Sequence, residues 1–305
     1  METYDYVVIG GGVAGLGALE ALPAEHSAVL LEGRRHLMHT LTWMKTVPLG
    51  TDGMTGVAYR ASLLDAAYEL EKAGRIRTEA RVFRVDKDRR VVHVRSAAGS
   101  HEEVGYRTLV VAVGATQILY GRYLLPGIRG GRFFTAYQVG EMLEHYEFLP
   151  GRELVIFGES AYALETAAAA RAQGLNATLV SPAGLPHPPA SLEDVPVYTN
   201  VRLKQVYGGK RFEGLLLQHG GRELAVAGDA LVVDGDFVLE HEWRTHLGVE
   251  WDLSAWRLAL DEREMQRHKL VFVGDAACPT PDFAAQYRAA RDRVDAVLNA
   301  QEAPA

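Results

Sequence analysis

The sequence predicts an α/β protein with two Rossmann-like dinucleotide-binding domains, each with three layers in the order strands, strands, helices (ββα). Two observations predict this fold class. A strand, a glycine-rich turn, a helix and a second strand follow one another over residues 6–32, and the same order returns over residues 151–180. Short alternating strands come after each unit, at 75–113 and 197–233.

The first glycine-rich turn follows four apolar residues, Tyr6–Ile9, which are expected to form a short buried strand. Glycines then stand at the spacing Gly-x-Gly-x-x-Gly, at positions Gly10, Gly12 and Gly15. The first permits a tight turn, the second lets the backbone approach a pyrophosphate, and the third lets the helix over 13–22 pack against the strand. That helix begins at Val13 and Ala14 and directs free N–H groups at the phosphates.

The second strand, Ala28–Leu31, ends in Glu32, an acid placed to accept hydrogen bonds from both ribose hydroxyls of an adenosine. A 2′-phosphate would be repelled there. The unit therefore predicts an adenine dinucleotide, either FAD or NAD. The alternative is a tight turn without a ligand, which is disfavoured because strand, helix, second strand and terminal acid are all present.

The other elements are predicted from periodicity and from glycine or proline at their ends. Helices are expected over 59–73, 136–146, 161–172 and 284–298, and strands over 81–85, 91–94, 106–113, 176–180, 230–233 and 270–273. Residues 33–56 are expected to form a linker that could line a cofactor. We expect one discontinuous domain over 1–118 and 240–305 and a second domain over 119–239, with the crossing at a segment rich in glycine.

Composition limits the class of protein. The chain has 305 residues, 48% hydrophobic and 23% charged, which is typical of a soluble globular protein. Its net charge of −7 disfavours nucleic acid and anionic membranes as partners, and no apolar run reaches the ~20 residues that span a bilayer. We expect a cytoplasmic location because the first 22 residues do not resemble a signal peptide. The scattered histidines predict no metal site.

Four features in this order resemble the flavoproteins of the pyridine nucleotide-disulfide oxidoreductase class, of which thioredoxin reductase is the compact member. They are the first glycine unit with Glu32, the strand Val110–Ala115, the second unit at Gly158, and Gly274-Asp275. The resemblance implies a thioredoxin reductase-like fold with FAD in the first unit and with Asp275 bound to the ribityl chain. A simple helix cap is the alternative role for Asp275. The expected FAD contacts are Gly10, Gly12, Val13, Ala14, Gly15, Glu32, Gly33, Arg34, Val82, Ala112, Gly114, Ala115, Gly274 and Asp275.

The chain departs from this class in its thiols. Disulfide reductases of the class carry a cysteine pair, whereas this chain has one cysteine, Cys278, so no disulfide forms within it. Cys278 is expected either near the flavin or, with more weight, as an inert small residue.

The second glycine turn is degraded as a nicotinamide site. It runs Gly158-Glu-Ser-Ala-Tyr-Ala163, where Ser160 replaces the glycine that admits a pyrophosphate and Glu159 adds a negative charge. The strand after it ends in Ser181, which is neither an acid for a ribose nor a cation for a 2′-phosphate. NAD(P)H is therefore disfavoured as a second cofactor.

These departures resemble the cysteine-free FAD subunits of heteromeric amine or amino-acid dehydrogenases, on the stretch from Leu125-Pro-Gly127 to Leu149-Pro-Gly151. The first hypothesis is an FAD-dependent oxidoreductase without a redox-active disulfide, which accepts electrons from a small-molecule substrate, a redox partner protein or NAD(P)H. A non-catalytic FAD-binding module or an electron-transfer subunit is the second, and an NAD-dependent dehydrogenase is the third. Both a homodimer and a heteromeric complex stay open.

A further hypothesis concerns residues near the reactive end of the flavin. The resemblance places Glu165, which follows the second glycine turn, toward the flavin, where it can pair with a lysine from residues 33–56. Lys45 is the only lysine in that stretch. We expect Glu165 and Lys45 to meet near flavin N5, where the cation would stabilise negative charge on the reduced ring. The alternative is a solvated lysine and a glutamate favoured by the helix dipole.

Overall fold

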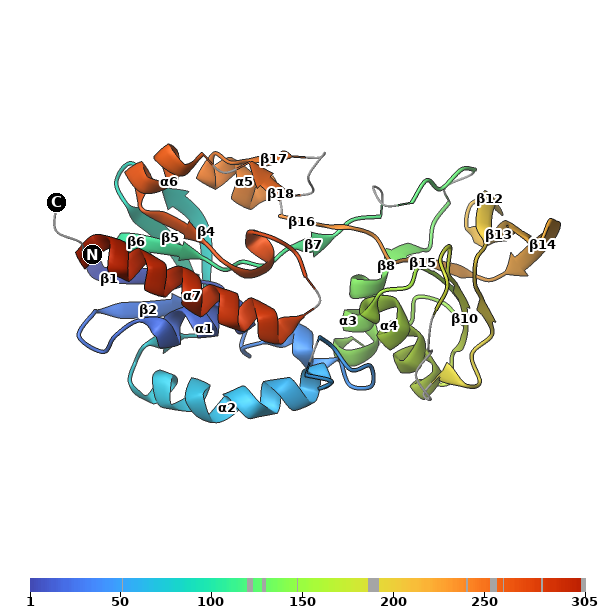
Figure 1. The fold of residues 1–305 in the computed structure, drawn as a ribbon, viewed down its shortest axis with the longest axis horizontal. Helices are drawn as coiled ribbons and strands as arrows, with labels where there is room; N and C mark the ends of the chain where they lie inside the picture. The colour runs from blue at the N-terminus through green and yellow to red at the C-terminus, as the bar shows by residue number, and fades with distance from the viewer. Residues whose placement is uncertain are drawn as a thin grey trace.

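The computed structural model describes residues 1–50, 52–119, 123–127, 130–146, 148–185, 192–239, 241–252, 257–259, 261–280 and 282–302. Figure 1 shows two α/β bodies side by side, with the N-terminus and the last described helix, α7, on the first. The α-helices are α1 (Val13–Ala21), α2 (Gly56–Lys72), α3 (Ala136–His145), α4 (Ala161–Ala172), α5 (His241–Leu247), α6 (Glu262–His268) and α7 (Phe283–Glu302). Among the described residues, the short 3-10 helices include η1 (His39–Thr42) and η3 (Gly274–Ala276).

The sheet of the first body has the strand order β3-β2-β1-β6-β5-β4, and β19 also pairs with β6. β6 joins two kinds of pairing: its first part is antiparallel to β5, and its second part is parallel to β19 and lies beside the parallel strands β1, β2 and β3. These strands are β1 (Glu2–Ile9), β2 (Ala28–Leu31), β3 (Ile76–Arg77), β4 (Ala80–Asp86), β5 (Val91–Ser96), β6 (His101–Val111) and β19 (Leu270–Phe272).

Alternate residues of β1 face opposite sides of this sheet. Tyr6 and Val8 pack in an apolar cluster with α1 and α7, whereas Val7 and Ile9 pack with buried valines of β4 and β5. The sheet is therefore covered by helices on one side and by strands on the other, which gives three layers.

The second body repeats this arrangement. Its parallel sheet has the order β11-β10-β9-β15-β8, and a three-stranded antiparallel sheet, β12-β13-β14, lies over one face. Leu154 and Ile156 of β9 face α3 and α4, whereas Val155 and Phe157 face the antiparallel sheet. The strands are β8 (Phe133–Thr135), β9 (Glu153–Phe157), β10 (Asn176–Val180), β11 (Val197–Tyr198), β12 (Arg202–Gly208), β13 (Phe212–His219), β14 (Arg222–Ala227) and β15 (Ala230–Val233).

The chain crosses between the two bodies twice, and the crossings lie side by side. β7 (Thr116–Gln117) leaves the first body and pairs antiparallel with β16 (Phe237–Val238), which returns to it (Figure 1). A small antiparallel pair, β17 (Glu250–Asp252) with β18 (Arg257–Ala259), follows α5.

The two Rossmann-like domains of the predicted fold class are confirmed, and the limits of individual elements shift for local reasons. β1 begins at Glu2 rather than Tyr6, because residues 2–4 pair with Val104–Tyr106 of β6. α2 begins at Gly56, where the Thr55 hydroxyl accepts a hydrogen bond from the Ala58 N–H at 3.3 Å. We retain the domain limits 1–118 with 240–305 and 119–239 as a proposal.

The expected linker over residues 33–56 contains a buried part between Leu37 and Leu49. Leu41, Trp43 and Met44 are at most 2% exposed and belong to the same apolar cluster as α1 and α4. A Cβ added to Gly140 of α3 would collide with the Trp43 ring, so this helix packs against the indole at close range. The segment thus ties the helical layers of the two bodies into one core. Among the described residues, no helix is both long enough and apolar enough to cross a bilayer.

Candidate functional site

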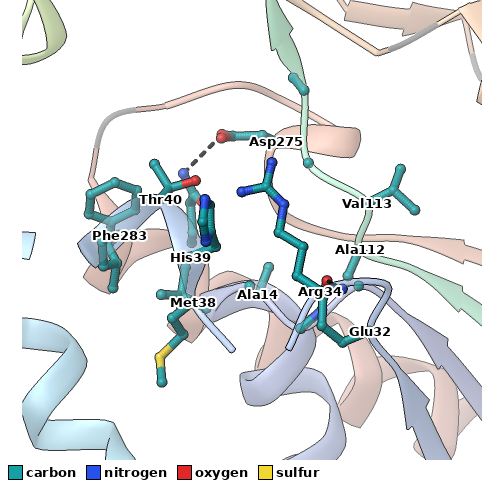
Figure 2. A pocket seen from close by; sticks show the side chains of 18 of the residues that line it. Ala14, Glu32, Arg34, Met38, His39, Thr40, Ala112, Val113, Asp275 and Phe283 are labelled. Carbon is teal, nitrogen blue, oxygen red and sulfur yellow. Dashed lines mark hydrogen bonds between the residues drawn. The ribbon is translucent and has the colours of Figure 1, made fainter. Parts of the chain in front are cut away.

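A cleft opens at the carboxyl ends of β1 and β6, between the two bodies. Its floor is residues 10–14 of the first glycine turn, Glu32 at the end of β2, and residues 112–115 after β6. Figure 2 shows Glu32 and Arg34 rising beside Ala14 and Ala112, with Asp275 across the cleft. Ligands of open α/β sheets bind in crevices at this edge.

The three motif glycines have different surroundings. A Cβ on Gly12 would meet no atom within 4 Å, and its φ of −74° suits any residue. A Cβ on Gly15 would instead collide with the carbonyl oxygen of Gly10, and Gly10 itself has a φ of 106°. Gly10 and Gly15 therefore serve the backbone, whereas Gly12 borders open space at the start of α1, where no described side chain caps the helix. This cradle fits the pyrophosphate of a dinucleotide.

Glu32 occupies the position expected for a ribose contact. Its Oε2 accepts a hydrogen bond from the Gly11 N–H at 2.6 Å, and its Oε1 accepts one from the Arg34 N–H at 2.7 Å. Gly33 and Val82 line a smaller recess behind Glu32 rather than the main cleft, and the two spaces share Gly10, Glu32 and Val113. A dinucleotide with its ribose at Glu32 would place its adenine in this recess.

Asp275 lies in η3 on the opposite wall. Its Oδ1 accepts hydrogen bonds from the Thr280 N–H at 2.8 Å and from Gln286 Nε2 at 2.9 Å. Burial raises the pKa of Asp275 to about 6, although both hydrogen bonds favour the ionised form. Asp282, whose Oδ1 accepts from the Ala285 N–H at 2.8 Å, caps the start of α7. The alternative role of Asp275 as that cap is therefore wrong.

Aromatic side chains of the second body close the cleft. Tyr137 of α3, Tyr162 of α4 and Phe237 of β16 line it, and the rings of Tyr162 and Phe237 have centroids 5.0 Å apart. Burial raises the pKa of Tyr137 to about 12 and that of Tyr162 well above its usual value, so both hydroxyls stay protonated at neutral pH. These rings form an apolar, uncharged wall opposite the glycine turn.

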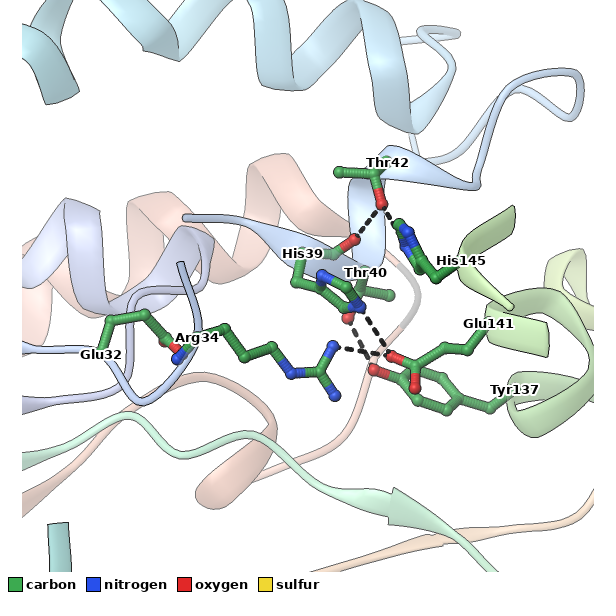
Figure 3. A network of polar contacts seen from close by, with 8 residues as sticks. All are labelled: Glu32, Arg34, His39, Thr40, Thr42, Tyr137, Glu141 and His145. Carbon is green, nitrogen blue, oxygen red and sulfur yellow. Dashed lines mark hydrogen bonds and ion pairs between the residues drawn. The ribbon is translucent and has the colours of Figure 1, made fainter. Parts of the chain in front are cut away.

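A polar network fixes α3 against η1 and against Arg34, which precedes it (Figure 3). Glu141 of α3 pairs with Arg34 Nη1 at 2.9 Å and with His39 Nε2 at 3.2 Å. The His39 ring stacks on His145 with centroids 4.3 Å apart. Arg34 is therefore held at the cleft by the second body, where its cation can face an anionic ligand.

Glu165 and residue 45 come together, but not as the expected ion pair. The carboxylate of Glu165, 1% exposed, accepts backbone N–H groups of Lys45, Thr46 and Val47 at 2.6–2.9 Å. The Lys45 ammonium turns away and contacts Glu144 Oε2 at 2.6 Å. Neither residue lines the cleft among the described residues, so the predicted cation near the flavin is corrected to a structural anion site. A carboxylate is well suited to three converging N–H donors.

The second glycine turn has no comparable cradle. A Cβ on Gly158 would collide with Asp234, whose carboxylate accepts the N–H groups of Glu159 and Ser160. The Ser160 hydroxyl in turn accepts the Tyr162 N–H at 3.1 Å and so caps α4. These N–H groups already have acceptors within the chain and are not open to a ligand.

A second cavity adjoins the main cleft and shares its walls at Tyr162, Phe237 and Asp275. Carboxylates of Asp234 and Asp236 also line it, and no lysine, arginine or histidine does among the described residues. The exposed Cys278 stands on its rim, three residues beyond Asp275. This cavity is acidic and partly aromatic.

Residues of these walls that sequence reasoning missed include Tyr137, Asp234 and Phe237. Each lies at or near the carboxyl end of a strand of the second body or in the returning crossing, and none belongs to a glycine motif. The available signal was an acid directly after the apolar run Ala230–Val233, the same pattern that identified Glu32 after β2.

Comparisons with known proteins identify the family and the fold of the chain. The family model described as pyridine nucleotide-disulphide oxidoreductase matches residues 4–302. No curated protein matches the chain. Similar solved structures include L-proline dehydrogenase from P. horikoshii, with 18% identity, a TM-score of 0.64 and 56% of that chain covered. Bacillithiol disulfide reductase from Bacillus cereus has 17% identity, a TM-score of 0.66 and 98% of its chain covered, and thioredoxin reductase from T. acidophilum has 14% identity, a TM-score of 0.64 and 100% of its chain covered. Each of the three matches covers 98–99% of this chain.

At such identities these likenesses show the fold. The chain spans about half the length of the proline dehydrogenase chain, and it covers 42% of histamine dehydrogenase from Rhizobium sp. 4-9, at 15% identity and a TM-score of 0.67.

Substitution of Gly12 should separate ligand binding from folding. We expect Gly12→Val to lose most of its bound FAD, because the new side chain fills the cradle, while the free energy of unfolding of the flavin-free protein changes by less than about 1 kcal/mol. Flavin content and urea denaturation measure the two effects. Gly184→Ala, a glycine with only distant neighbours, is the control and should keep full flavin. A yellow Gly12→Val protein would contradict the placement.

The different contacts of Glu165 and Lys45 predict that substitutions at these two positions have unequal effects on stability. Glu165→Ala should lower the free energy of unfolding by about 3 kcal/mol, because it leaves buried N–H groups without an acceptor. Lys45→Met removes only an exposed ion pair and should cost at most about 1 kcal/mol. Chemical denaturation of both variants tests this, and equal effects would contradict it.

Asp275 predicts a pH dependence of stability. Its pKa is raised in the folded protein, so the unfolded chain loses the proton first and the contribution to stability falls as pH rises from the ordinary value near 3.8 to about 6. Asparagine cannot ionise, so Asp275→Asn should gain stability relative to the flavin-free wild type over this range, by up to about 2 kcal/mol. Denaturation curves at several pH values measure the difference, which a pH-independent result would contradict.

Proposed function

This chain belongs to the pyridine nucleotide-disulphide oxidoreductase family, and we propose that it is an FAD-dependent oxidoreductase that works without a redox-active disulfide. The observation that supports this most is the cleft itself. The open cradle at Gly12, Glu32 at the end of β2, and Asp275 from near the C-terminus are far apart in sequence and meet around one elongated space. That space suits a dinucleotide whose two halves lie on either side of α1.

Each of these residues is proposed to hold one part of FAD. The N–H groups at the start of α1 and the Arg34 cation would hold the pyrophosphate, Glu32 the adenosine ribose and Asp275 the ribityl chain. When bound, FAD supplies a two-electron acceptor. The rings of Tyr137, Tyr162 and Phe237 would exclude water at that end of the cleft.

The electron donor is proposed to be a small organic cation. A dithiol within the chain is excluded by the single cysteine, and the N–H groups of the second glycine turn are engaged by Asp234. The second cavity opens on the same aromatic wall, and Asp236 and Asp275 line it with no basic residue among the described ones. Carboxylates and aromatic rings attract ammonium groups. An amine or amino acid fits this chemistry, and the similar proline and histamine dehydrogenases are named for such substrates.

An electron-transfer subunit or a non-catalytic FAD module is the second candidate. It is favoured by exposed apolar side chains beside α3. Tyr146, Phe148 and Leu149, which follow α3, are 49–64% exposed and could contact another subunit. In this case the electrons would come from a partner protein rather than from the second cavity.

The visible spectrum and anaerobic titration of the purified protein test this proposal. We expect flavin absorption bands that bleach on addition of a small primary or secondary amine, at concentrations where neither NADH nor NADPH bleaches them. The Gly12→Val protein, reconstituted with the same reagents, is the control and should show no amine-dependent bleaching.

Other outcomes would change the assignment. A colourless protein that does not take up added FAD would contradict the whole proposal. A flavin reduced by dithionite but by no small donor would favour the electron-transfer subunit, and rapid reduction by NADH or NADPH at micromolar concentration would overturn the choice of donor.

A further inference from the structure

Asp234 is a buried carboxylate with an unusual set of partners. It follows β15 directly, is 1% exposed, and accepts the Glu159 N–H at 3.2 Å, the Ser160 N–H at 2.8 Å and the Ser160 hydroxyl at 2.6 Å. Gln117 Nε2 donates to it at 3.0 Å. Two of these donors are backbone groups of the second glycine turn. The carboxylate thus lies on that turn as an anionic ligand would.

The two glycine turns of the chain allow a direct comparison. Gly10 and Gly158 correspond, because each donates its N–H to the last residue of the neighbouring parallel strand, Leu31 or Val180. It follows that Gly12 corresponds to Ser160. At Gly12 the space beyond the turn is open and α1 has no described side-chain cap, whereas Ser160 caps α4 with its own hydroxyl.

We propose that Asp234 is the residue that excludes nicotinamide dinucleotides from the second domain, because it occupies the anion position of its glycine turn. A pyrophosphate carries negative charge and needs the N–H groups at the turn. Here it would have to displace a buried carboxylate from four hydrogen bonds, and Asp234 cannot leave the turn without losing the charge-assisted contacts that stabilise it. Glu159 adds a second negative charge beside the turn.

Displacement of Asp234 would also disturb the FAD cleft. Gln117, which donates to Asp234, accepts the Tyr137 N–H through its Oε1 at 2.9 Å. Tyr137 stands at the start of α3 and lines the cleft. The same carboxylate therefore closes one nucleotide site and positions a wall of the other, which ties the two roles to one buried residue.

The inference does not depend on which donor reduces the flavin, and its test uses binding rather than turnover. ADP-ribose and NADH are titrated by calorimetry against the FAD-loaded wild type and against Asp234→Ala/Ser160→Gly, which restores the glycine and removes the anion. We expect the double variant to bind both probes at least about tenfold more tightly than the wild type, a difference of ~1.4 kcal/mol.

Asp229 offers a matched control. It lies just before β15, at the other end of the same strand, and its carboxylate also accepts two backbone N–H groups, of Arg152 and Glu153. Asp229→Ala removes a carboxylate that also holds backbone N–H groups, though a more exposed one, without touching the glycine turn, and it should leave binding of both probes as weak as in the wild type.

Each outcome decides the proposal. Wild-type protein that binds NADH at micromolar concentration would overturn it, as would a folded double variant whose affinity equals that of the wild type. If the double variant does not fold, as judged by circular dichroism and flavin content, Asp234→Asn is used, since it removes the charge and keeps the shape. Tighter binding by this single variant than by Asp229→Asn is then expected, and equal binding would overturn the proposal. If no protein holds FAD, the proposed function is contradicted. The inference is then tested by the difference in probe affinity between the double variant and Asp229→Ala, because the first glycine turn is the same in both.

Discussion

The carboxylate of Glu165 is the constraint on which the arrangement of the site depends. Three consecutive backbone N–H groups, of residues 45–47, converge on it from the first body, while the residue itself belongs to α4 of the second. Backbone donors in an irregular segment need a partner when they are buried, and a charged acceptor supplies the strongest one available. Because these hydrogen bonds fix the segment, Trp43 stays packed against Gly140. The rings of Tyr137 and Tyr162, which contact Trp43, therefore stay opposite the first glycine turn.

The two halves of the chain share one backbone design but place the acid at the glycine turn differently. In the first turn the acid, Glu32, lies to the side and accepts the Gly11 N–H, so the helix start at Gly12 faces open space. In the second turn the acid, Asp234, comes from the strand on the other side and lies over the turn itself. A carboxylate at a helix N-terminus is favourable in both cases. What differs is whether it leaves room for a second anion, and this geometric difference separates a binding site from a scaffold.

Local sequence predicted much of the fold and the first half of the site. The glycine spacing, the acid after β2 and the returning strand before Asp275 are contiguous patterns, so each could be recognised without its neighbours. The positions of Asp234, Tyr137 and Phe237 depend on the strand order, which brings residues that are far apart in the sequence to one edge of the sheet. The expected ion pair of Glu165 with Lys45 failed for a related reason. Glu165 does lie beside residue 45, as expected. The buried carboxylate, however, accepts the backbone N–H groups, and the lysine side chain pairs with Glu144 at the surface.

The buried segment around Trp43 has a consequence for how this protein unfolds. Its side chains join apolar residues of α1, α4 and α7 in a single cluster that runs through both bodies. Two domains connected only by a β-ribbon would melt separately, each with its own transition. A core shared between them couples their opening, so amide hydrogens deep in α1 and in α4 should exchange with solvent through the same cooperative event.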